Sequence, residues 1–317
     1  TAAPYAATCL GMIDGFDAAQ AGDTDALNVK ASDDGKTLTI VLAYPCSYFD
    51  KMAAFAAMSP VQQATVEANG DSWCTSAETF VSNGPYMITD WTPSERIVLT
   101  KNPYYVGGWD SSKIVSDTIT LLLLEDSSAA FAAYNSGEAV LIKDVPTDEI
   151  PSLTKAEDGG DFYVDTILGT YYISMNLQHD AFKEAKVRKA LALAIDRDYI
   201  ANTIMQGTYE PAYNFVGPGI VDETGMFYDN ANGGERYISE DYEANLEEAK
   251  SLLADAGYPD GEGFPTITYS ANDAGYHVPV AEYVQQAWGD LGITVNIDKV
   301  EWASFLPLRR AGDYDVS

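Results

Sequence analysis

Basic side chains are scarce in this sequence of 317 residues, which holds 18 lysines and arginines against 48 aspartates and glutamates. The formal net charge of -30 would repel the phosphates of DNA or RNA, so a nucleic-acid partner is excluded. Such a surface opposes aggregation but names no substrate. The length suggests two domains, and an apolar fraction of 46% predicts a folded core rather than a disordered chain.

Long hydrophobic runs are also missing. A membrane-spanning helix needs roughly 20 apolar residues in succession, whereas the most hydrophobic run, Thr118–Leu124, is short enough to be one buried strand. The chain opens without a basic segment followed by an apolar one. We therefore expect that any signal peptide has been removed or lies upstream of Thr1.

Cysteine and histidine are rare. An odd number of cysteines, Cys9, Cys46 and Cys74, leaves at least one thiol free or paired outside this segment. A Cys46–Cys74 bridge in an oxidising compartment is one alternative, and three buried free thiols are the other. The two histidines, His179 and His277, lack the spacing that holds zinc on one helix face, so a hydrolytic zinc site is not expected.

The common motifs of catalysis are absent. The sequence has no GxSxG, no GxxxxGK[ST] and no GxGxxG. A partial match to a calcium loop over Asp229–Glu240 lacks side-chain oxygens where Ala231 and Gly233 stand. We therefore expect no enzyme, metal or cofactor. The 21 tyrosines and 5 tryptophans suit either the wall of a ligand cleft or a core.

Hydrophobic periodicity predicts hairpins first. One hairpin is expected to join residues 27–30 to 37–42 through Asp33-Asp34-Gly35-Lys36. A second is expected to join residues 86–91 to 95–100 around Thr92-Pro93-Ser94. The strand near 118–124 follows.

From about Glu125 onward, helices alternate with strands, which predicts an α/β domain. The expected helices run from a Ser127 cap to Gly137, through 184–206 as two helices with Asp196 capping the second, from an Asn245 cap to Gly257, and from Pro279 to Gly292. The expected strands lie at 163–165, 170–177 and 293–297.

Several short motifs follow one another along the chain. They are the hairpin Asp33–Leu38, Ser82-Asn83-Gly84-Pro85-Tyr86, Leu99–Tyr105, Val187–Arg197, Ala249–Tyr258, and Leu291-Gly292-Ile293 with Glu301-Trp302. In this order they resemble the family 5 extracellular solute-binding proteins, the oligopeptide- and dipeptide-binding proteins of ABC importers. The run Val187–Arg197 is the most specific match.

The resemblance implies an α/β, type II periplasmic-binding-protein-like fold with two lobes that enclose a solute. The chain starts inside the family's pattern, so we expect an internal fragment that is incomplete at both ends. Residues 1–78 would belong to the small extra lobe of peptide-binding proteins, and 79–124 to strands of the first lobe and hinge. Residues 125–317 would form the second α/β lobe without its C-terminal part.

The resemblance further implies a monomeric receptor that binds peptides without chemistry and delivers them to the membrane permease of an ABC importer. Its expected location is extracytoplasmic, periplasmic or at the cell surface, with a lipid anchor in an N-terminal segment not present here. Related receptors for nickel, haem, opines and oligosaccharides carry the same motifs, so another small solute is an alternative. A fragment that binds nothing alone and an enzyme are two further alternatives.

The main candidate ligand contacts lie on the strand expected at 170–177, which resembles a ligand-presenting strand of the peptide binders. Side-chain alternation predicts one face formed by Thr170, Tyr172, Ser174 and Asn176. It predicts a core face formed by Tyr171, Ile173 and Met175. We expect Tyr172 as a pocket wall and Ser174 as a hydrogen-bonding group, with a core ring as the alternative for Tyr172.

Two further segments resemble regions that border the family's cleft. Lys143 and Asp144 are expected in a loop beside the cleft, with a solvated pair as the alternative. Trp302 is expected either to stack on a ligand side chain or to pack between domains.

Basic residues supply the remaining candidates. Arg309 or Arg310 is expected to meet a ligand carboxylate. His277 precedes the helix from Pro279, in a segment that the family uses near the pocket mouth, and a surface histidine is the alternative. The basic cluster within 183–197 is expected to balance neighbouring acids, with a permease contact as the alternative.

Overall fold

The computed structural model describes residues 6–108, 110, 114–154, 160–222 and 225–317. The chain divides into two compact units, Thr1–Leu123 and Leu124–Ser317, called here the N-terminal and C-terminal units. Within the described ranges, the helices are too short or too polar to cross a membrane.

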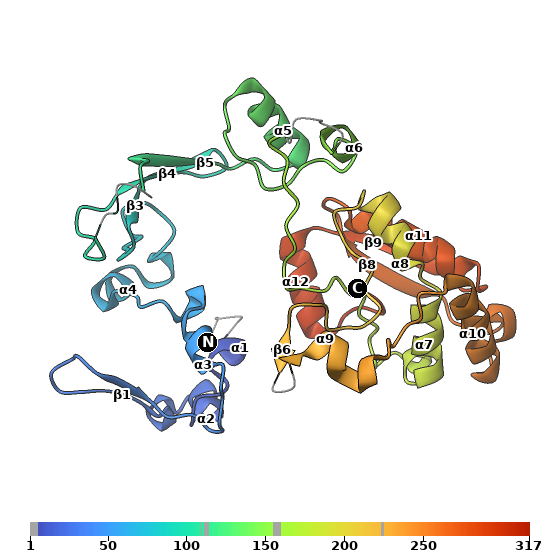
Figure 1. The fold of residues 1–317 in the computed structure, drawn as a ribbon. Coiled ribbons are helices and arrows are strands. Elements are labelled where there is room, and N and C mark those ends of the chain that lie inside the picture. Colours follow the sequence, from blue (N-terminus) through green and yellow to red (C-terminus); the bar gives the residue numbers. More distant parts are fainter. Residues whose placement is uncertain (1–5, 109, 111–113, 155–159, 223–224) are drawn as a thin grey trace. The chain divides into compact units, whose positions relative to one another are not determined.

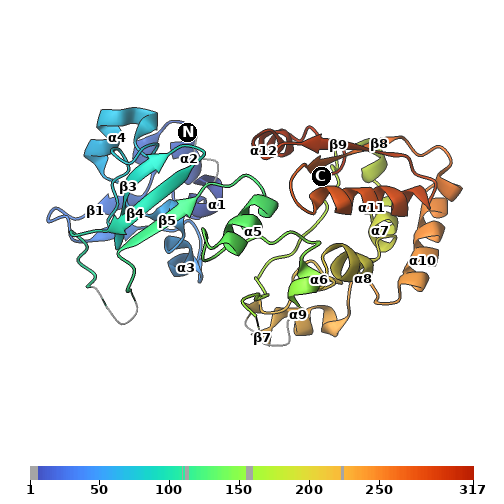
Figure 2. The ribbon, with the colours of Figure 1, turned by 90° about the horizontal axis from the view of Figure 1, so that it is seen from above.

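The N-terminal unit contains both expected hairpins (Figure 2). Strands β1 (Val29–Ala31) and β2 (Leu38–Ile40) pair antiparallel. Strands β3 (Tyr86–Thr92), β4 (Arg96–Lys101) and β5 (Thr118–Leu122) form an antiparallel sheet in that order. Both hairpin predictions are confirmed. The second carries an irregularity in register between Ile88 and Asp90 that the sequence did not indicate.

Strand β5 is not the buried strand that its hydrophobicity suggested. It pairs with β4 along one edge, but Ile119 is 37% exposed and Leu121 is 47% exposed. Apolar composition predicts the extended conformation of a strand, whereas burial also depends on which neighbours cover its two faces. The expectation of burial is therefore wrong for this strand.

The helices of the N-terminal unit are short. They are α1 (Ala6–Leu10), α2 (Phe16–Gln20), α3 (Phe49–Ala53) and α4 (Gln63–Asn69). All three cysteines are free thiols, so the Cys46–Cys74 bridge is not formed. Of the two alternatives, buried thiols fit Cys9, which is 2% exposed, while Cys46 and Cys74 are half-buried.

The C-terminal unit is an α/β arrangement (Figure 1). Its helices are α5 (Ser127–Ser136), α6 (Ile150–Leu153), α7 (Ala185–Leu193), α8 (Arg197–Tyr199), α9 (Phe227–Asn230), α10 (Tyr242–Asp255), α11 (His277–Gly289) and α12 (Trp302–Ala311). Strands β8 (Ile267–Asn272) and β9 (Val295–Val300) pair in parallel, with α11 as the connection between them. A small hairpin is formed by β6 (Val221–Asp222) and β7 (Gly225–Met226).

Aspartates cap three of these helices. Asp196 caps α8 as predicted, because its carboxylate accepts from the Tyr199 amide at 3.0 Å. Asp126 caps α5, and the expectation that Ser127 does so is wrong. Asp241 likewise caps α10 in place of Asn245. Asn245 instead lies buried inside the helix, where its side-chain amide donates to a carbonyl oxygen at 2.7 Å.

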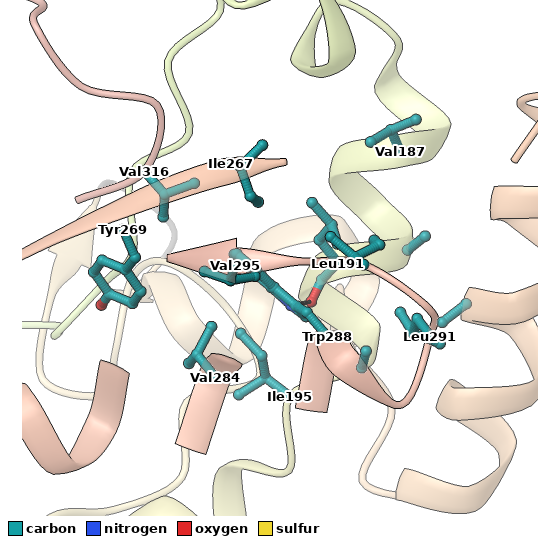
Figure 3. Packing of buried hydrophobic residues seen from close by; sticks show 14 of the residues in the cluster. Val187, Leu191, Ile195, Ile267, Tyr269, Val284, Trp288, Leu291, Val295 and Val316 are labelled. Atoms are coloured by element: carbon teal, nitrogen blue, oxygen red, sulfur yellow. Dashed lines mark hydrogen bonds between the residues drawn. The ribbon is translucent and has the colours of Figure 1, made fainter. Parts of the chain in front are cut away.

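The hydrophobic core joins α7, α10 and α11 to the β8–β9 pair (Figure 3). Trp288 of α11 is fully buried, and its indole Nε1 donates to the Leu191 carbonyl of α7 at 3.0 Å. The apolar stripe expected within 184–206 is the buried face of α7, with Val187, Ala190 and Leu191 at 0% exposure. The most specific motif of the sequence is therefore a packing surface.

Basic residues of α7 pair with acids of a second helix. The Nζ atom of Lys186 lies 3.1 Å from a carboxylate oxygen of Asp255, and that of Lys189 lies 2.6 Å from one of Glu248. Both acids belong to α10. The expected balance of charge is therefore present, although it crosses between helices rather than running along one.

The segment expected as a strand at 170–177 is regular only near its end. Ser174 and Ser317 exchange two backbone hydrogen bonds of 2.7 and 3.0 Å, and Met175 bridges Val316 in antiparallel fashion. Val316 also bridges Tyr269 of β8. The stretch near 163–165 is irregular, and Tyr163 is 80% exposed, so the strand expected there is wrong.

Candidate functional site

The segment 170–176 presents a mixed face to solvent. Tyr172 is 51% exposed, while Ile173 and Met175 pack against the core as predicted. Tyr171, expected in the core, is 40% exposed. That expectation is wrong because backbone alternation is imperfect in this irregular stretch, and the Tyr171 ring packs on His277 at 5.6 Å between ring centres.

Arg309, in the last turn of α12, is the charged group of the site. Its Nη2 donates to the Ser174 hydroxyl at 2.9 Å. Its guanidinium carbon lies 5.8 Å from the ring centre of Tyr172 and 5.8 Å from that of Phe305. No ion pair to Arg309 occurs in the part of the chain that the structure describes. A half-buried cation held by a neutral hydroxyl between rings is suited to bind an anionic group.

A cluster of tyrosines surrounds His277, the first residue of α11. The Tyr171 hydroxyl lies 3.0 Å from His277 Nδ1, and the hydroxyls of Tyr209 and Tyr276 lie 2.7 Å apart. Burial lowers the pKa of His277, which favours the neutral imidazole. Burial also raises the pKa of Tyr269, while the positive charge of Arg309 opposes that rise. The cluster therefore offers uncharged rings and hydroxyls beside one cation.

The remaining predicted contacts lie in two separate places, at the start of α12 and in a loop near residue 143. Trp302 is the first residue of α12, is 53% exposed and stacks on Phe305 at 5.9 Å. Glu301 before it caps the helix, which fixes where the indole emerges. Lys143 and Asp144 are exposed. The pKa of Tyr276 is raised, mainly by burial and by the hydrogen bond with Tyr209. Negative charge on Tyr209, Tyr171 or Asp144 raises it further.

The side chain of Asn176 lies outside the tyrosine cluster and already forms hydrogen bonds within the chain. Its side-chain amide donates to the carbonyls of Gly312 at 2.9 Å and Tyr314 at 2.7 Å, which holds the turn after α12. It lines an open hollow of about 500 Å³, together with Gln178, His179, Thr268, Ser270, Asp298, Leu308, Gly312, Asp313, Tyr314 and Asp315. Thr268 and Ser270 alternate with Tyr269 along β8, so the hollow and the tyrosine cluster lie on opposite faces of that strand.

The structure thus brings Tyr172, Ser174 and Arg309 together and places Asn176 apart from them. Sequence reasoning missed Phe215, whose ring lies 5.4 Å from that of Tyr172. It also missed Tyr269, because the strand Ile267–Asn272 was not anticipated. The abundance of tyrosine was the available signal, but it gave no positions. Across the described residues, acids, cysteines and histidines form no group of three suited to a metal ion.

The α/β unit with its parallel strand pair belongs to the class of type II periplasmic-binding-protein-like folds, which the solved structures below share. Residues 4–317 match the family model described as "Bacterial extracellular solute-binding proteins, family 5 Middle". The chain belongs to this family.

Individual relatives agree. The periplasmic oligopeptide-binding protein OppA of Salmonella typhimurium is 35% identical over 323 residues, covering 100% of this chain and 57% of the relative. The structure of the murein tripeptide binding protein MppA of Escherichia coli matches with a TM-score of 0.81 and 29% identity, covering 100% of this chain and 60% of that one. The structure of Haemophilus influenzae OppA in complex with RPPGFSPFR gives a TM-score of 0.79 at 28% identity, with coverages of 99% and 60%. The chain therefore spans little more than half of its relatives' length.

Proposed function

We propose that the protein to which this chain belongs is an extracytoplasmic receptor of an ABC importer that binds peptides. The observation that carries this proposal is Arg309, a half-buried cation bonded to Ser174 and flanked by aromatic rings in a chain of net charge -30. Acids elsewhere take up lysines and arginines, as at Lys186 and Lys189. A guanidinium kept away from them is available for a carboxylate, which every unmodified peptide carries.

The binding mode follows from the surrounding groups. The peptide carboxylate would accept two parallel hydrogen bonds from Arg309. Tyr172 would form a wall, and His277 with its tyrosines, Trp302, Lys143 and Asp144 would border the site. Binding and release complete the task of such a receptor, so no bond of the peptide is broken. The names of the relatives, which bind oligopeptides and a murein tripeptide, support the ligand class.

The cellular setting is part of the same proposal. The receptor acts as a monomer outside the cytoplasm, held by a lipid anchor, and transfers its peptide to the importer's permease. Residues 1–78 belong to the extra lobe, 79–124 to the first lobe and hinge, and 125–317 to the second lobe. The family membership and the relatives named periplasmic support this setting.

Calorimetric titration of the full-length protein with di- to hexapeptides tests the proposal. We expect binding, and we expect Arg309→Gln to weaken it by about tenfold to a hundredfold, the usual worth of a charged hydrogen bond. Amidation of the peptide's carboxyl end should weaken its binding to the natural protein by the same factor. Arg310→Gln is the matched control, because Arg310 neighbours Arg309 on α12 but is exposed, and it should leave affinity unchanged.

Absence of heat with every peptide would exclude a peptide receptor. Equal losses for Arg309→Gln and Arg310→Gln would instead assign the effect to general charge and remove Arg309 from the site. Native mass spectrometry of freshly purified protein would identify a retained solute of another class.

A further inference from the structure

Phe215 is an exposed aromatic residue in an otherwise well-packed loop. Its side chain is 69% exposed, whereas residues 211–214 before it and 216–217 after it are half-buried. A phenyl ring has no polar end that water can solvate. Single exposed apolar residues are common, but this one pairs with a second exposed ring, because Tyr172 is 51% exposed and 5.4 Å away.

Hydrogen bonds fix the loop that carries Phe215. The guanidinium of Arg197 donates to the Ala212 carbonyl at 2.8 Å, and the Tyr213 hydroxyl donates to Asp198 at 2.6 Å. The Tyr237 amide donates to the side chain of Asn214 at 2.7 Å.

The same loop is tied directly to the segment that holds the candidate site. The Thr170 hydroxyl donates to the carbonyl of Phe215 at 2.7 Å. Phe215 is therefore held in a defined place beside Tyr172, and a ligand would meet a surface that is already ordered.

The position of this ring pair relative to Arg309 gives it a role. Tyr172 has the Phe215 ring at 5.4 Å and the Arg309 guanidinium at 5.8 Å, so one surface carries two rings next to a cation. We propose that Phe215 and Tyr172 select peptides whose last residue, the one that bears the carboxylate, has an aromatic side chain. This inference rests on the proposed function.

Charge complementarity and reach support this occupant. The carboxylate of the last residue is drawn to Arg309, and the side chain of that residue starts at the neighbouring carbon. Because Tyr172 lies only 5.8 Å from the guanidinium, a ring on this residue can approach Tyr172 to the separation of about 4.5–7 Å at which aromatic rings pack. Small side chains would leave both rings in water, and acidic ones would gain no contact from Phe215.

Three tripeptides with one phenylalanine moved through the sequence test the assignment: Ala-Ala-Phe, Ala-Phe-Ala and Phe-Ala-Ala. Their dissociation constants are measured by calorimetry on the full-length protein, together with that of Ala-Ala-Ala. We expect Ala-Ala-Phe to bind about three- to tenfold more tightly than the other three, the worth of one aromatic contact. Phe215→Ala should abolish this advantage, so that Ala-Ala-Phe then binds no more tightly than Ala-Ala-Ala.

Tyr199→Ala is the matched control. Tyr199 is 44% exposed and stacks on Tyr283 at 4.8 Å, so it forms a comparable ring pair outside the Tyr172–Phe215 surface. This variant should keep the advantage of Ala-Ala-Phe. If the four peptides bind the natural protein equally, or if the advantage survives Phe215→Ala, the specificity assignment is overturned while the peptide receptor stands. If no peptide binds, both the specificity assignment and the proposed peptide receptor are overturned.

Discussion

At the scale of single residues, the contact between His277 and Tyr171 couples the candidate site to pH. The Nδ1 atom of His277 lies 3.0 Å from the Tyr171 hydroxyl, and the ring also lies 4.6 Å from that of Tyr276. Burial lowers the pKa of His277. The folded protein therefore takes up this proton less readily than the unfolded chain does, because protonation would place a charge among rings.

The sign of the resulting pH dependence is fixed. Because the unfolded chain binds the proton first, the contribution of His277 to stability is complete above the usual histidine pKa of about 6.5. It is lost as the pH falls toward the lowered folded-state pKa. We expect the melting temperature of the full-length protein to fall as the pH is lowered from about 7.5 to about 5. The melting temperature of the His277→Gln variant should fall less over the same range. If the melting temperature of the variant depends on pH in the same way as that of the natural protein, the role assigned to His277 is contradicted.

The side chains of one short segment show what residue patterns can predict. Alternation correctly placed Ile173 and Met175 on the core, because both flank Ser174, whose backbone pairs with that of Ser317. It failed for Tyr171, where the backbone has left that pairing and ring contacts decide the orientation. The partnership of Ser174 with Arg309 spans 135 residues, and local patterns carry no information about it.

At the scale of elements, a close approach of two loops positions the β8–β9 pair. Gly292 precedes β9 and Gly261 precedes β8, and both have positive φ angles of 82° and 75°. A Cβ atom added at Gly292 would overlap the Asp260 carbonyl oxygen. The Leu291-Gly292-Ile293 motif thus reflects a backbone contact that admits no side chain.

Two glycine substitutions separate this contact from backbone strain alone. Gly257 ends α10 with φ of 95°, and a Cβ there would meet no atom within 4 Å. We expect Gly257→Ala to lower the free energy of unfolding by about 1–2 kcal/mol, the cost of the left-handed conformation. Gly292→Ala should cost about 2–5 kcal/mol, because the overlap adds to that strain. Urea denaturation measures both, and equal losses would contradict the loop contact.

The caps show how far element boundaries follow from sequence. Asp196 was identified as a cap because this aspartate follows the apolar stripe of the first expected helix and is placed to cap the second. The sequence predicted Asn245 as the cap of α10, whereas Asp241, four residues earlier, occupies that position, and either residue type fits the chemistry of a cap. Burial decided between them, since Asn245 faces the core and bonds to a carbonyl there.

At the scale of the whole molecule, the net charge of -30 governs the response to salt. Each base paired across α7 and α10 neutralises one acid, but 48 acids far outnumber 18 bases. The excess charge repels itself across the surface and destabilises the compact state. Dissolved ions screen this repulsion.

Added salt should therefore stabilise the protein at neutral pH. We expect the melting temperature at pH 7 to rise as sodium chloride increases from about 0.05 M to about 0.5 M, over which the screening length shrinks severalfold. At pH 4.1, the isoelectric point of the sequence, the same increase should have little effect. A melting temperature at pH 7 that is constant or falls with salt would contradict this prediction.

The sequence by itself determined the family, the hairpins, helices α5, α7, α8, α10 and α11, and the acidic surface. Each of these depends on local periodicity, on cap and turn residues or on composition, which are properties of neighbouring residues. Only the tertiary structure decided that Arg309 meets Ser174, that Phe215 lies beside Tyr172 and that Asn176 is used for a turn. These contacts join segments 43 to 138 residues apart, and their energies depend on packing and burial that no local pattern encodes.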